Sequence, residues 1–481
     1  MPHSWNVRIR PAAICAGLSL SLALSLSLAL LAASPAEAEL FEAKTYTLKN
    51  GMEVVVLPRH LAPVVFQVVV YKVGAADGEK AKNGVAHFLE HLMFKATKKM
   101  AAGQFSQDVD RLGGTDNAFT NQDMTAYHQE FAAEHLPAIM AAEADRMVNL
   151  QLDDSVVLPE RDVILNERGQ TVESDPGSRL AEAMNAATFQ NHPYGLPIIG
   201  WRHEMESYST EDALNFYRRW YAPNNAILIV AGDVEPEAVR ALAEKNFGPL
   251  SARDLPERVR LQEPPPEAAR RLALSSPEVE HPSMWRRYVS ESYRTAGLTK
   301  GDNAPYALSL LAEVMGGGAV GRLYKQLVIT DGVALSAGAS YNGDPRDYGS
   351  FTFYVSPRNP AELDKAEKAV DAEIGKLLKD GVTEQELADA KKRLLMDAAK
   401  SRDSLNGPAL LVAEALAGGE TMEDIQAWPD RIEAVTTADV MKAAKAVLVP
   451  ENSVTSTLTP EAPADANADA NADANAAEPT P

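Results

Sequence analysis

The 481-residue chain has almost no cysteine, since its single thiol, Cys15, lies in the N-terminal segment. Without that segment the chain has no thiol, which excludes disulfides, cysteine nucleophiles and thiolate zinc ligands. Any metal must then be held by histidine and carboxylate side chains. The chain also lacks net positive charge, with a formal charge of −21. Nucleic acid and anionic membranes are therefore not expected as its main partners, because both attract basic surfaces.

The first 38 residues have the pattern of an export signal. Arg8 and Arg10 precede an apolar run over 11–33, and Ala36-Glu37-Ala38 has the small residues of a cleavage site. We predict a signal peptide over 1–38 and a periplasmic or secreted mature protein. Because the apolar run is long for a signal, an uncleaved membrane anchor is the alternative.

The most informative stretch is Gly84 to Met93, GVAHFLEHLM. On a helix at about 100° per residue, its apolar residues form one stripe, and His87, Glu90 and His91 lie on the opposite face. Two histidines one turn apart can hold a single ion, and zinc favours nitrogen ligands in a tetrahedral shell. Glu90, between them, is better placed to take a proton from water than to join the shell. The order His-x-x-Glu-His is the inverzincin form, and a merely solvated polar face is the alternative.

A helix over 158–174 is a candidate source of a further ligand. Pro159 is expected in its first turn, and Asp175-Pro176 ends it. Glu160 and Glu167 are seven positions apart and so share one face, two turns from each other. These carboxylates either supply a ligand or belong to a solvated charged face.

The rest of the chain alternates between strand and helix patterns in two similar halves. The stretch 209–230 parallels 436–458, with Thr, Asp, Pro and Asn repeated at an offset of 437 − 210 = 227 positions. The charged segment 253–275, with three consecutive prolines, is interpreted as a linker. We predict an α+β fold with halves at 39–252 and 276–460, each a mixed, mainly antiparallel β-sheet covered by helices, together enclosing a chamber.

The predicted halves are not equivalent in chemistry. At roughly the same offset the counterpart of the HFLEH helix falls near 308–315, which contains no histidine. Only the first half can then hold the metal. The end of the chain, 461–481, consists of Ala-Asp-Ala-Asn repeats without an apolar face, and we predict that it is disordered.

With HFLEH at 87–91 and a glutamate 167 − 91 = 76 positions after the second histidine, the chain resembles the pitrilysin/insulinase family of zinc peptidases. The likeness is greatest to the mitochondrial-processing-peptidase-like branch, which includes exported bacterial members. ERDVILNE at 160–167 matches the family's stretch except at Asn166, where a second Glu is usual. The resemblance implies one zinc ion per chain and the following roles: His87, His91 and Glu167 as ligands, Glu90 as catalytic base, and Glu160 as the carboxylate that orients a ligand or the metal.

The segment GGTDNAFT at 113–120 is similar to the edge strand on which the family's peptide substrates add by β-augmentation. This implies that Asn117 and Ala118 contact substrate and that Phe119 lines a side-chain pocket. The alternative is a plain strand with a core phenylalanine. HPYG at 192–195 is also family-like but does not indicate any chemistry.

One departure from the family concerns the second half. The family's LRExxGLAY supplies an Arg and a Tyr that bind substrate, whereas LVITDGVAL at 327–335 has Val328 and Leu335 at these positions. Neither side chain can donate a hydrogen bond to a developing oxyanion. Arg322 and Tyr324, one turn earlier, are not expected to substitute. We therefore predict a homologous partner subunit that carries the Arg and Tyr, in a hetero-oligomer, with a homodimer as the alternative.

The resemblance implies a zinc-dependent endopeptidase acting on unfolded peptides. Two alternatives remain from the residues alone. One is a non-catalytic scaffold or binding subunit of the same fold, and the other is a zinc hydrolase acting on another bond, such as an ester. The ligand set also does not distinguish zinc from cobalt or manganese.

Overall fold

The computed structural model describes residues 40–298 and 303–461 of the chain. The predicted signal peptide lies outside the described residues, and so does the predicted tail from residue 462 onward. Among the residues that are described, no helix combines the length and the apolar character needed to cross a bilayer.

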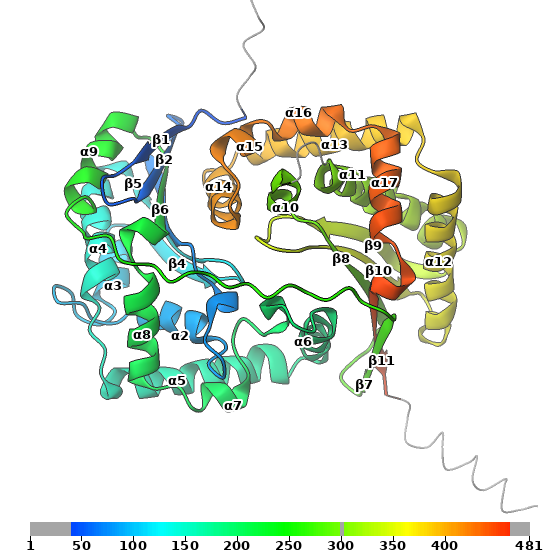
Figure 1. Cartoon of the computed structure of the whole chain (residues 1–481), viewed down its shortest axis with the longest axis horizontal. Helices are drawn as coiled ribbons and strands as arrows, with labels where there is room; N and C mark the ends of the chain where they lie inside the picture. Colours follow the sequence, from blue (N-terminus) through cyan, green and yellow to red (C-terminus); the bar gives the residue numbers. More distant parts are fainter. Residues whose placement is uncertain (1–39, 299–302, 462–481) are drawn as a thin grey trace, which may run out of the picture. The chain divides into compact units, whose positions relative to one another are not determined.

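Within the described residues the strands form two sheets (Figure 1). The first has the order β1-β2-β6-β3-β5-β4, and the second has the order β7-β11-β8-β10-β9. The strands of the first sheet are β1 Lys44–Thr47, β2 Glu53–Pro58, β3 Val64–Tyr71, β4 Thr115–Thr120, β5 Thr125–Ala132 and β6 Ala226–Gly232. The strands of the second sheet are β7 Arg270–Ser276, β8 Ser283–Ser290, β9 Ala334–Asn342, β10 Gly349–Pro357 and β11 Ser453–Pro460.

The two sheets are copies of one arrangement. In each, one pair is parallel, β2 with β6 and β7 with β11, and the other neighbours are antiparallel. The strands β2, β6, β3, β5 and β4 therefore correspond to β7, β11, β8, β10 and β9. The predicted pair of similar halves, each with a mixed, mainly antiparallel sheet, is confirmed.

Helices cover both sheets. Those of the first half are α2 Val85–Leu92, α3 Gln104–Arg111, α4 Leu136–Asn149, α5 Asp154–Arg168, α6 Pro176–Thr188, α7 Arg202–Met205, α8 Thr210–Trp220 and α9 Pro236–Asn246. Those of the second half are α10 Tyr293–Leu298, α11 Ala304–Gly316, α12 Leu363–Asp380, α13 Glu384–Ser401, α14 Asn406–Gly418, α15 Met422–Gln426, α16 Trp428–Ala434 and α17 Thr437–Val447. Each half has its own hydrophobic core.

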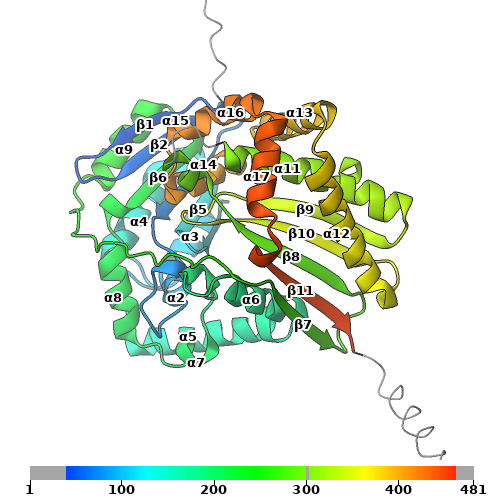
Figure 2. The same ribbon diagram turned by 45° about the vertical axis from the view of Figure 1, so that its right-hand side comes forward.

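Each half also contributes a helix that packs on the sheet of the other half. Helix α6, from the first half, packs on β7 and β11 of the second sheet (Figure 2), and α14, from the second half, packs on β3 and β6 of the first sheet. Helix α11 packs on β9 as α2 packs on β4. It contains the predicted counterpart of the HFLEH helix, so the second half has a helix at that place without the histidines.

The helix predicted to begin at 158 begins four residues earlier. Asp153 caps α5, because its carboxylate accepts a hydrogen bond from the backbone N–H of Ser155 at 2.9 Å. That cap is a stronger start signal than Pro159, which lies inside the helix. The α-helix ends at Arg168 and continues as a π-helical turn over Gly169–Glu173, so the predicted end near residue 174 describes both pieces together.

The predicted linker, 253–275, is too long at its end, because β7 begins at Arg270. The partner of β7 is β11, more than 170 residues away in sequence, and local sequence carries no sign of it. The linker is also anchored rather than loose. The Arg260 guanidinium lies 3.1 Å from carboxylate oxygens of Asp77 and Asp123 in the first half and of Asp347 in the second.

Gly84 begins the helix that carries the two histidines. Its φ of +85° lies in the left-handed region, and a Cβ there would lie 2.4 Å from the carbonyl oxygen of Ile199. Gly113 has a similar φ of +72°, but a Cβ at this position would have no heavy atom within 4 Å. Comparing substitutions at the two glycines therefore separates the cost of a left-handed backbone from the cost of steric overlap with neighbouring atoms.

We expect Gly113→Ala to lower the free energy of unfolding by about 1–2 kcal/mol, the cost of a left-handed L-residue. Gly84→Ala should cost a further 1–3 kcal/mol or so, because the surrounding backbone must also shift. Urea unfolding followed by circular dichroism measures both. Equal losses in the two variants would show that the contact with Ile199 does not constrain the start of α2.

Candidate metal centre

The apolar side of α2 is buried against α8 and against β4 and β5 of the first sheet. Phe88, Leu89 and Leu92 have no exposed surface, and Val85 is nearly as buried. This stripe fixes the rotation of the helix and turns the face with the histidines toward α5, against which α2 packs. The glutamates of α5 are thereby brought within reach of the imidazoles.

Three side chains from the two helices converge. Nε2 of His87 lies 3.7 Å from Oε1 of Glu167, and Nε2 of His91 lies 3.3 Å from Oε2 of Glu167. One donor atom from each of the three lies within 4.8 Å of the others. The structure therefore brings together the three residues that the sequence singled out as ligands, although 76 positions separate His91 from Glu167.

Glu160 lies beside the cluster without joining it. Its Oε1 is 3.1 Å from Nδ1 of His91, and its Oε2 is 2.5 Å from Nζ of Lys95. A carboxylate bound to the far nitrogen of an imidazole fixes the orientation of the ring and leaves Nε2 free to bind an ion. Nδ1 of His87 is buried and has no such partner among the described residues.

The donor set fits a zinc ion. Two imidazole nitrogens and one carboxylate, with a fourth position left open, make up a known catalytic zinc shell. Oε2 of Glu167 is buried and faces the imidazoles, and the nitrogen that it faces is Nε2 of His91 at 3.3 Å, so a bound metal ion would take the place of the proton on His91. The described residues contain no other group of three or more potential ligands this close together.

The two histidines differ in charge when no metal is bound. Burial, together with the neighbouring His91, lowers the pKa of His87 to about 4. Burial also opposes a charge on His91, but hydrogen bonding to Glu160 and the proximity of Glu167 outweigh it and raise the pKa of His91 to about 9. His91 in turn lowers the pKa of Glu167. Of the two imidazoles, His91 is thus the one that is positively charged among the carboxylates.

Glu90 is largely buried beside the cluster, with 8% of its surface exposed. Its Oε2 accepts a hydrogen bond of 2.6 Å from the hydroxyl of Thr120, at the end of β4. Burial raises the pKa of Glu90, and the Thr120 hydrogen bond partly opposes this. A carboxylate with a raised pKa is suited to accept and release a proton near neutral pH.

Two residues near the cluster were not found from the sequence. Thr120 belongs to a strand whose pattern gives no sign that its end contacts α2. Arg168, directly after Glu167, donates to Glu182 at 2.8 and 2.9 Å and to the carbonyl oxygen of Gly200 at 2.8 Å, which fixes the end of α5. The only sign of Arg168 in the sequence is that a cationic side chain directly follows a candidate ligand.

The predicted substrate strand is β4, at the edge of the first sheet. Asn117 lies opposite His128 and Phe119 lies opposite Ala126, so both side chains are on one face, while Ala118 is on the face of α2. Asn117 is exposed, and Phe119 is partly buried with its ring 6.3 Å from that of His128. Phe119 is therefore not part of the core of the first half.

The second half has no cationic or hydroxyl side chain at the two positions noted above. Val328 lies in a π-helical turn and packs against the core of the second half. Leu335, on β9, is 45% exposed. Arg322 forms an ion pair with Glu386 at 2.6 Å.

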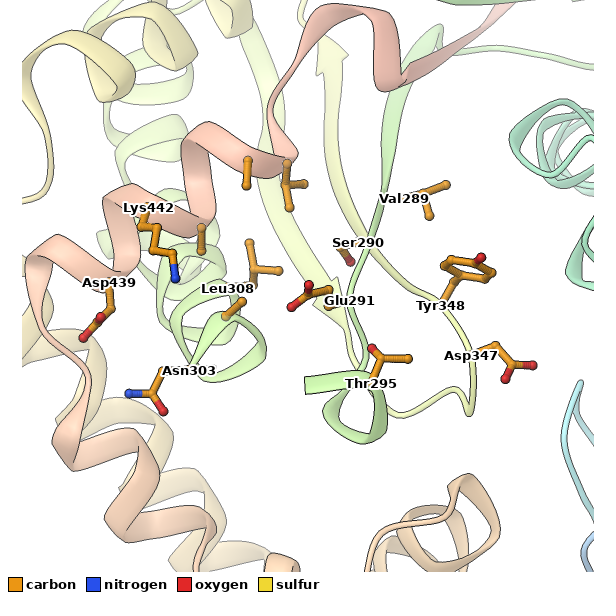
Figure 3. Close-up of a pocket in the computed structure, with 14 residues that line it drawn as sticks. Val289, Ser290, Glu291, Thr295, Asn303, Leu308, Asp347, Tyr348, Asp439 and Lys442 are labelled. Atoms are coloured by element: carbon orange, nitrogen blue, oxygen red, sulfur yellow. The ribbon is translucent and has the colours of Figure 1, made fainter. Parts of the chain in front are cut away.

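A separate pocket of about 500 Å³ lies in the second half, between α17, α11 and the end of β8 (Figure 3). Lys442 and Asp439 of α17 line it, together with Thr295 and Tyr348. None of the side chains of the metal centre borders this pocket.

Comparison with known proteins gives matches over most of the chain. "Insulinase (Peptidase family M16)" matches residues 54–201, and "Peptidase M16 inactive domain" matches 207–394. The zinc protease PqqE of Helicobacter pylori is 30% identical over 404 residues, 83% of this chain and 88% of that protein. The crystal structure of a protease from Helicobacter pylori has a TM-score of 0.80 at 27% identity and covers 87% of this chain and 100% of that one. The periplasmic protease PqqL from Escherichia coli has a TM-score of 0.75 at 20% identity, over 92% of this chain and 51% of that one.

The charge on His91 predicts how the stability of the metal-free protein depends on pH. Its pKa is about 9 in the folded chain and 6.5 when unperturbed, so the folded state holds the proton more tightly. The resulting stabilisation is complete below pH 6.5 and is lost as the pH rises through about 9. We expect the free energy of unfolding of chelator-treated protein to fall by up to about 3 kcal/mol over this window.

Urea titrations at several pH values measure this fall, with His91→Gln as the control. The difference between the two proteins isolates the imidazole from other titrating groups. Parallel pH profiles for the parent protein and His91→Gln would contradict the assigned charge.

Proposed function

Because the chain belongs to the insulinase (M16) family of peptidases, we propose that it is a zinc-dependent endopeptidase that hydrolyses unfolded peptides. The observation that carries this proposal is the convergence of His87, His91 and Glu167 beside the buried carboxyl group of Glu90. The relatives named as zinc proteases support the metal and the class of reaction.

In the proposed reaction His87, His91 and Glu167 hold one zinc ion per chain. When bound, zinc would act as a Lewis acid. It would polarise the scissile carbonyl group and lower the pKa of water, so that the water can lose a proton and attack near neutral pH. Glu90 accepts the proton of the attacking water and delivers it to the leaving amine. Thr120 keeps the Glu90 carboxylate oriented through its 2.6 Å hydrogen bond.

Substrate is proposed to bind along the free edge of β4 as an added strand. Asn117 and Ala118 then lie beside the peptide backbone, and Phe119 with His128 provides an aromatic surface for a side chain. Unfolded segments are favoured, because only an extended backbone can pair with an edge strand. This use of β4 also favours peptides over esters, the substrates of the rival zinc hydrolase.

The proposed site requires a partner. Val328 and Leu335 cannot donate hydrogen bonds to the transition state, so a homologous subunit with the missing Arg and Tyr is proposed to complete the site. The fold of this chain corresponds to about half of PqqL, 51% of that protein, which is consistent with two such units acting together. A hetero-oligomer is favoured over a homodimer, because a second copy of this chain would also have Val328 and Leu335 at these positions.

The second candidate is a scaffold or binding subunit of the same fold, and the missing Arg and Tyr favour it. The intact set of two histidines and two glutamates favours catalysis instead, since a scaffold has no need of them. We also propose export, with cleavage after Ala38 and a periplasmic or secreted mature protein.

Glu90→Gln should retain zinc and lose turnover by about 10²–10⁴-fold, because the amide cannot accept a proton. His87→Ala should lose zinc as well as turnover. Metal content by elemental analysis and cleavage of an unstructured fluorogenic peptide, with the co-purified partner present, measure both. Full activity of Glu90→Gln would overturn the role of the base, and zinc-loaded protein inert even with its partner would favour the scaffold.

Glu160→Gln should weaken zinc binding by roughly 10–100-fold, because the amide holds Nδ1 of His91 less strongly. The affinity is measured by competition with a chromogenic chelator. Glu313→Gln is the matched control, since Glu313 pairs with Arg393 in the second half and not with the ligands. Equal affinities in the two variants would remove Glu160 from the metal centre.

A further inference from the structure

A second pocket lies between the two halves, at the turn that follows β4. Its volume is about 430 Å³, within the range of small-molecule sites. It is bordered by the turn Asn121–Met124, by α6 and α14, by β8 and by the loop between β9 and β10. None of the metal-centre side chains lines it, so it is a site of its own.

Arg287, on β8, is the unusual residue of this pocket. Its guanidinium donates through Nη1 to the amide oxygen of Asn185 on α6, and no carboxylate among the described residues forms an ion pair with it. Its Nε is buried without a hydrogen-bond partner, and burial lowers the pKa of Arg287. By contrast, the adjacent Arg286 pairs with Glu367 at 2.7 Å. An unpaired cation in such a place is costly, and an anionic ligand would relieve the cost.

The same pocket has acidic side chains without cationic partners. Asp344, in the β9–β10 loop, and Glu414, on α14, line it and are exposed to it. Neither forms an ion pair with a described basic residue. Partial burial by the surrounding protein raises the pKa of both carboxyl groups. The charge of Asp344 raises the pKa of Glu414 further. The pocket therefore offers unpaired charge of both signs.

A ligand that satisfies both signs of charge must itself carry both. A dianion such as phosphate would meet Arg287 but would be repelled by the two carboxylates. We infer that the pocket binds a short peptide with free ends, its carboxylate on Arg287 and its ammonium group toward Asp344 and Glu414. The source of such peptides rests on the proposed peptidase function, while the binding itself does not.

Three peptides test the charge requirement directly. Trialanine with free ends, its C-terminal amide and its N-acetyl form are titrated by calorimetry into the full chain carrying His87→Ala, which cannot turn them over. Trialanine should bind, and the amide and acetyl forms should bind about tenfold more weakly, since each loses one charge-assisted contact. Inorganic phosphate should not compete. Equal binding of the three peptides, or none of trialanine, would overturn the assignment.

Variants then assign the contacts. In the same background Arg287→Met should weaken trialanine binding about tenfold, and Arg287→Lys should weaken it less. Asn185→Ala is the matched control, because it removes the hydrogen-bond partner of Arg287 but keeps the charge. If Arg287 serves only to hold α6 in place, Arg287→Met and Asn185→Ala will weaken trialanine binding equally, and the proposal fails.

The acidic end has its own test. Asp344→Asn with Glu414→Gln should weaken trialanine but leave the N-acetyl form unchanged, since that form has no ammonium group. Equal weakening of both peptides would count against the proposed orientation.

Thermal unfolding checks that each variant is folded, and the three-peptide comparison stands without any pocket variant. Because the chain used has no turnover, failure of binding leaves the peptidase proposal intact, and failure of the peptidase proposal leaves the binding result intact.

Discussion

The burial of one side of α2 determines everything that the metal centre can do. Phe88, Leu89 and Leu92 are fully buried where α2 packs on α8 and the first sheet, and each contributes roughly 1.5–3 kcal/mol to holding the helix there. With its rotation fixed, the helix directs His87 and His91 toward α5 and places Glu90 against the end of β4. Without a metal, the cluster is held by the contacts of His91 with Glu160 and Glu167, and these can form only because the apolar contact turns α2 toward α5.

The same fold serves two different purposes in the two halves. Both have a helix packed on the strand at the edge of the sheet, α2 on β4 and α11 on β9. In α2 the face turned away from the core is polar, while α11 buries residues on nearly every side. Helix α11 therefore has no counterpart of the histidine face of α2.

Local patterns were sufficient for much of the fold but not for the grouping of the site. The helix expected within Gly84 to Met93 is α2, and the edge strand expected within 113–120 is β4, because glycines mark where each begins. The pairing of HFLEH with Glu167 followed from spacing and from likeness to a family, since no periodicity relates two helices 76 positions apart. The fold predicted in this way is confirmed.

What remained hidden depends on contacts between distant segments. The hydroxyl of Thr120 meets Glu90 only because β4 ends beside α2, and β7 exists only because β11 offers it an edge. Arg260 looked like part of a solvated linker, yet three carboxylates from separate segments surround it. Charged residues of this kind have no local signature, because their burial is decided by partners elsewhere in the chain.

The exchange of α6 and α14 has a consequence for how such a chain can evolve and be divided. Each repeat provides a wall of its neighbour, so a piece ending at the linker would leave the apolar side of the first sheet, including Phe66 and Val68, open to water. The duplicated units are therefore not modules that can be shuffled singly. Selection must act on the pair, which lets one copy lose its chemistry while remaining indispensable to the other.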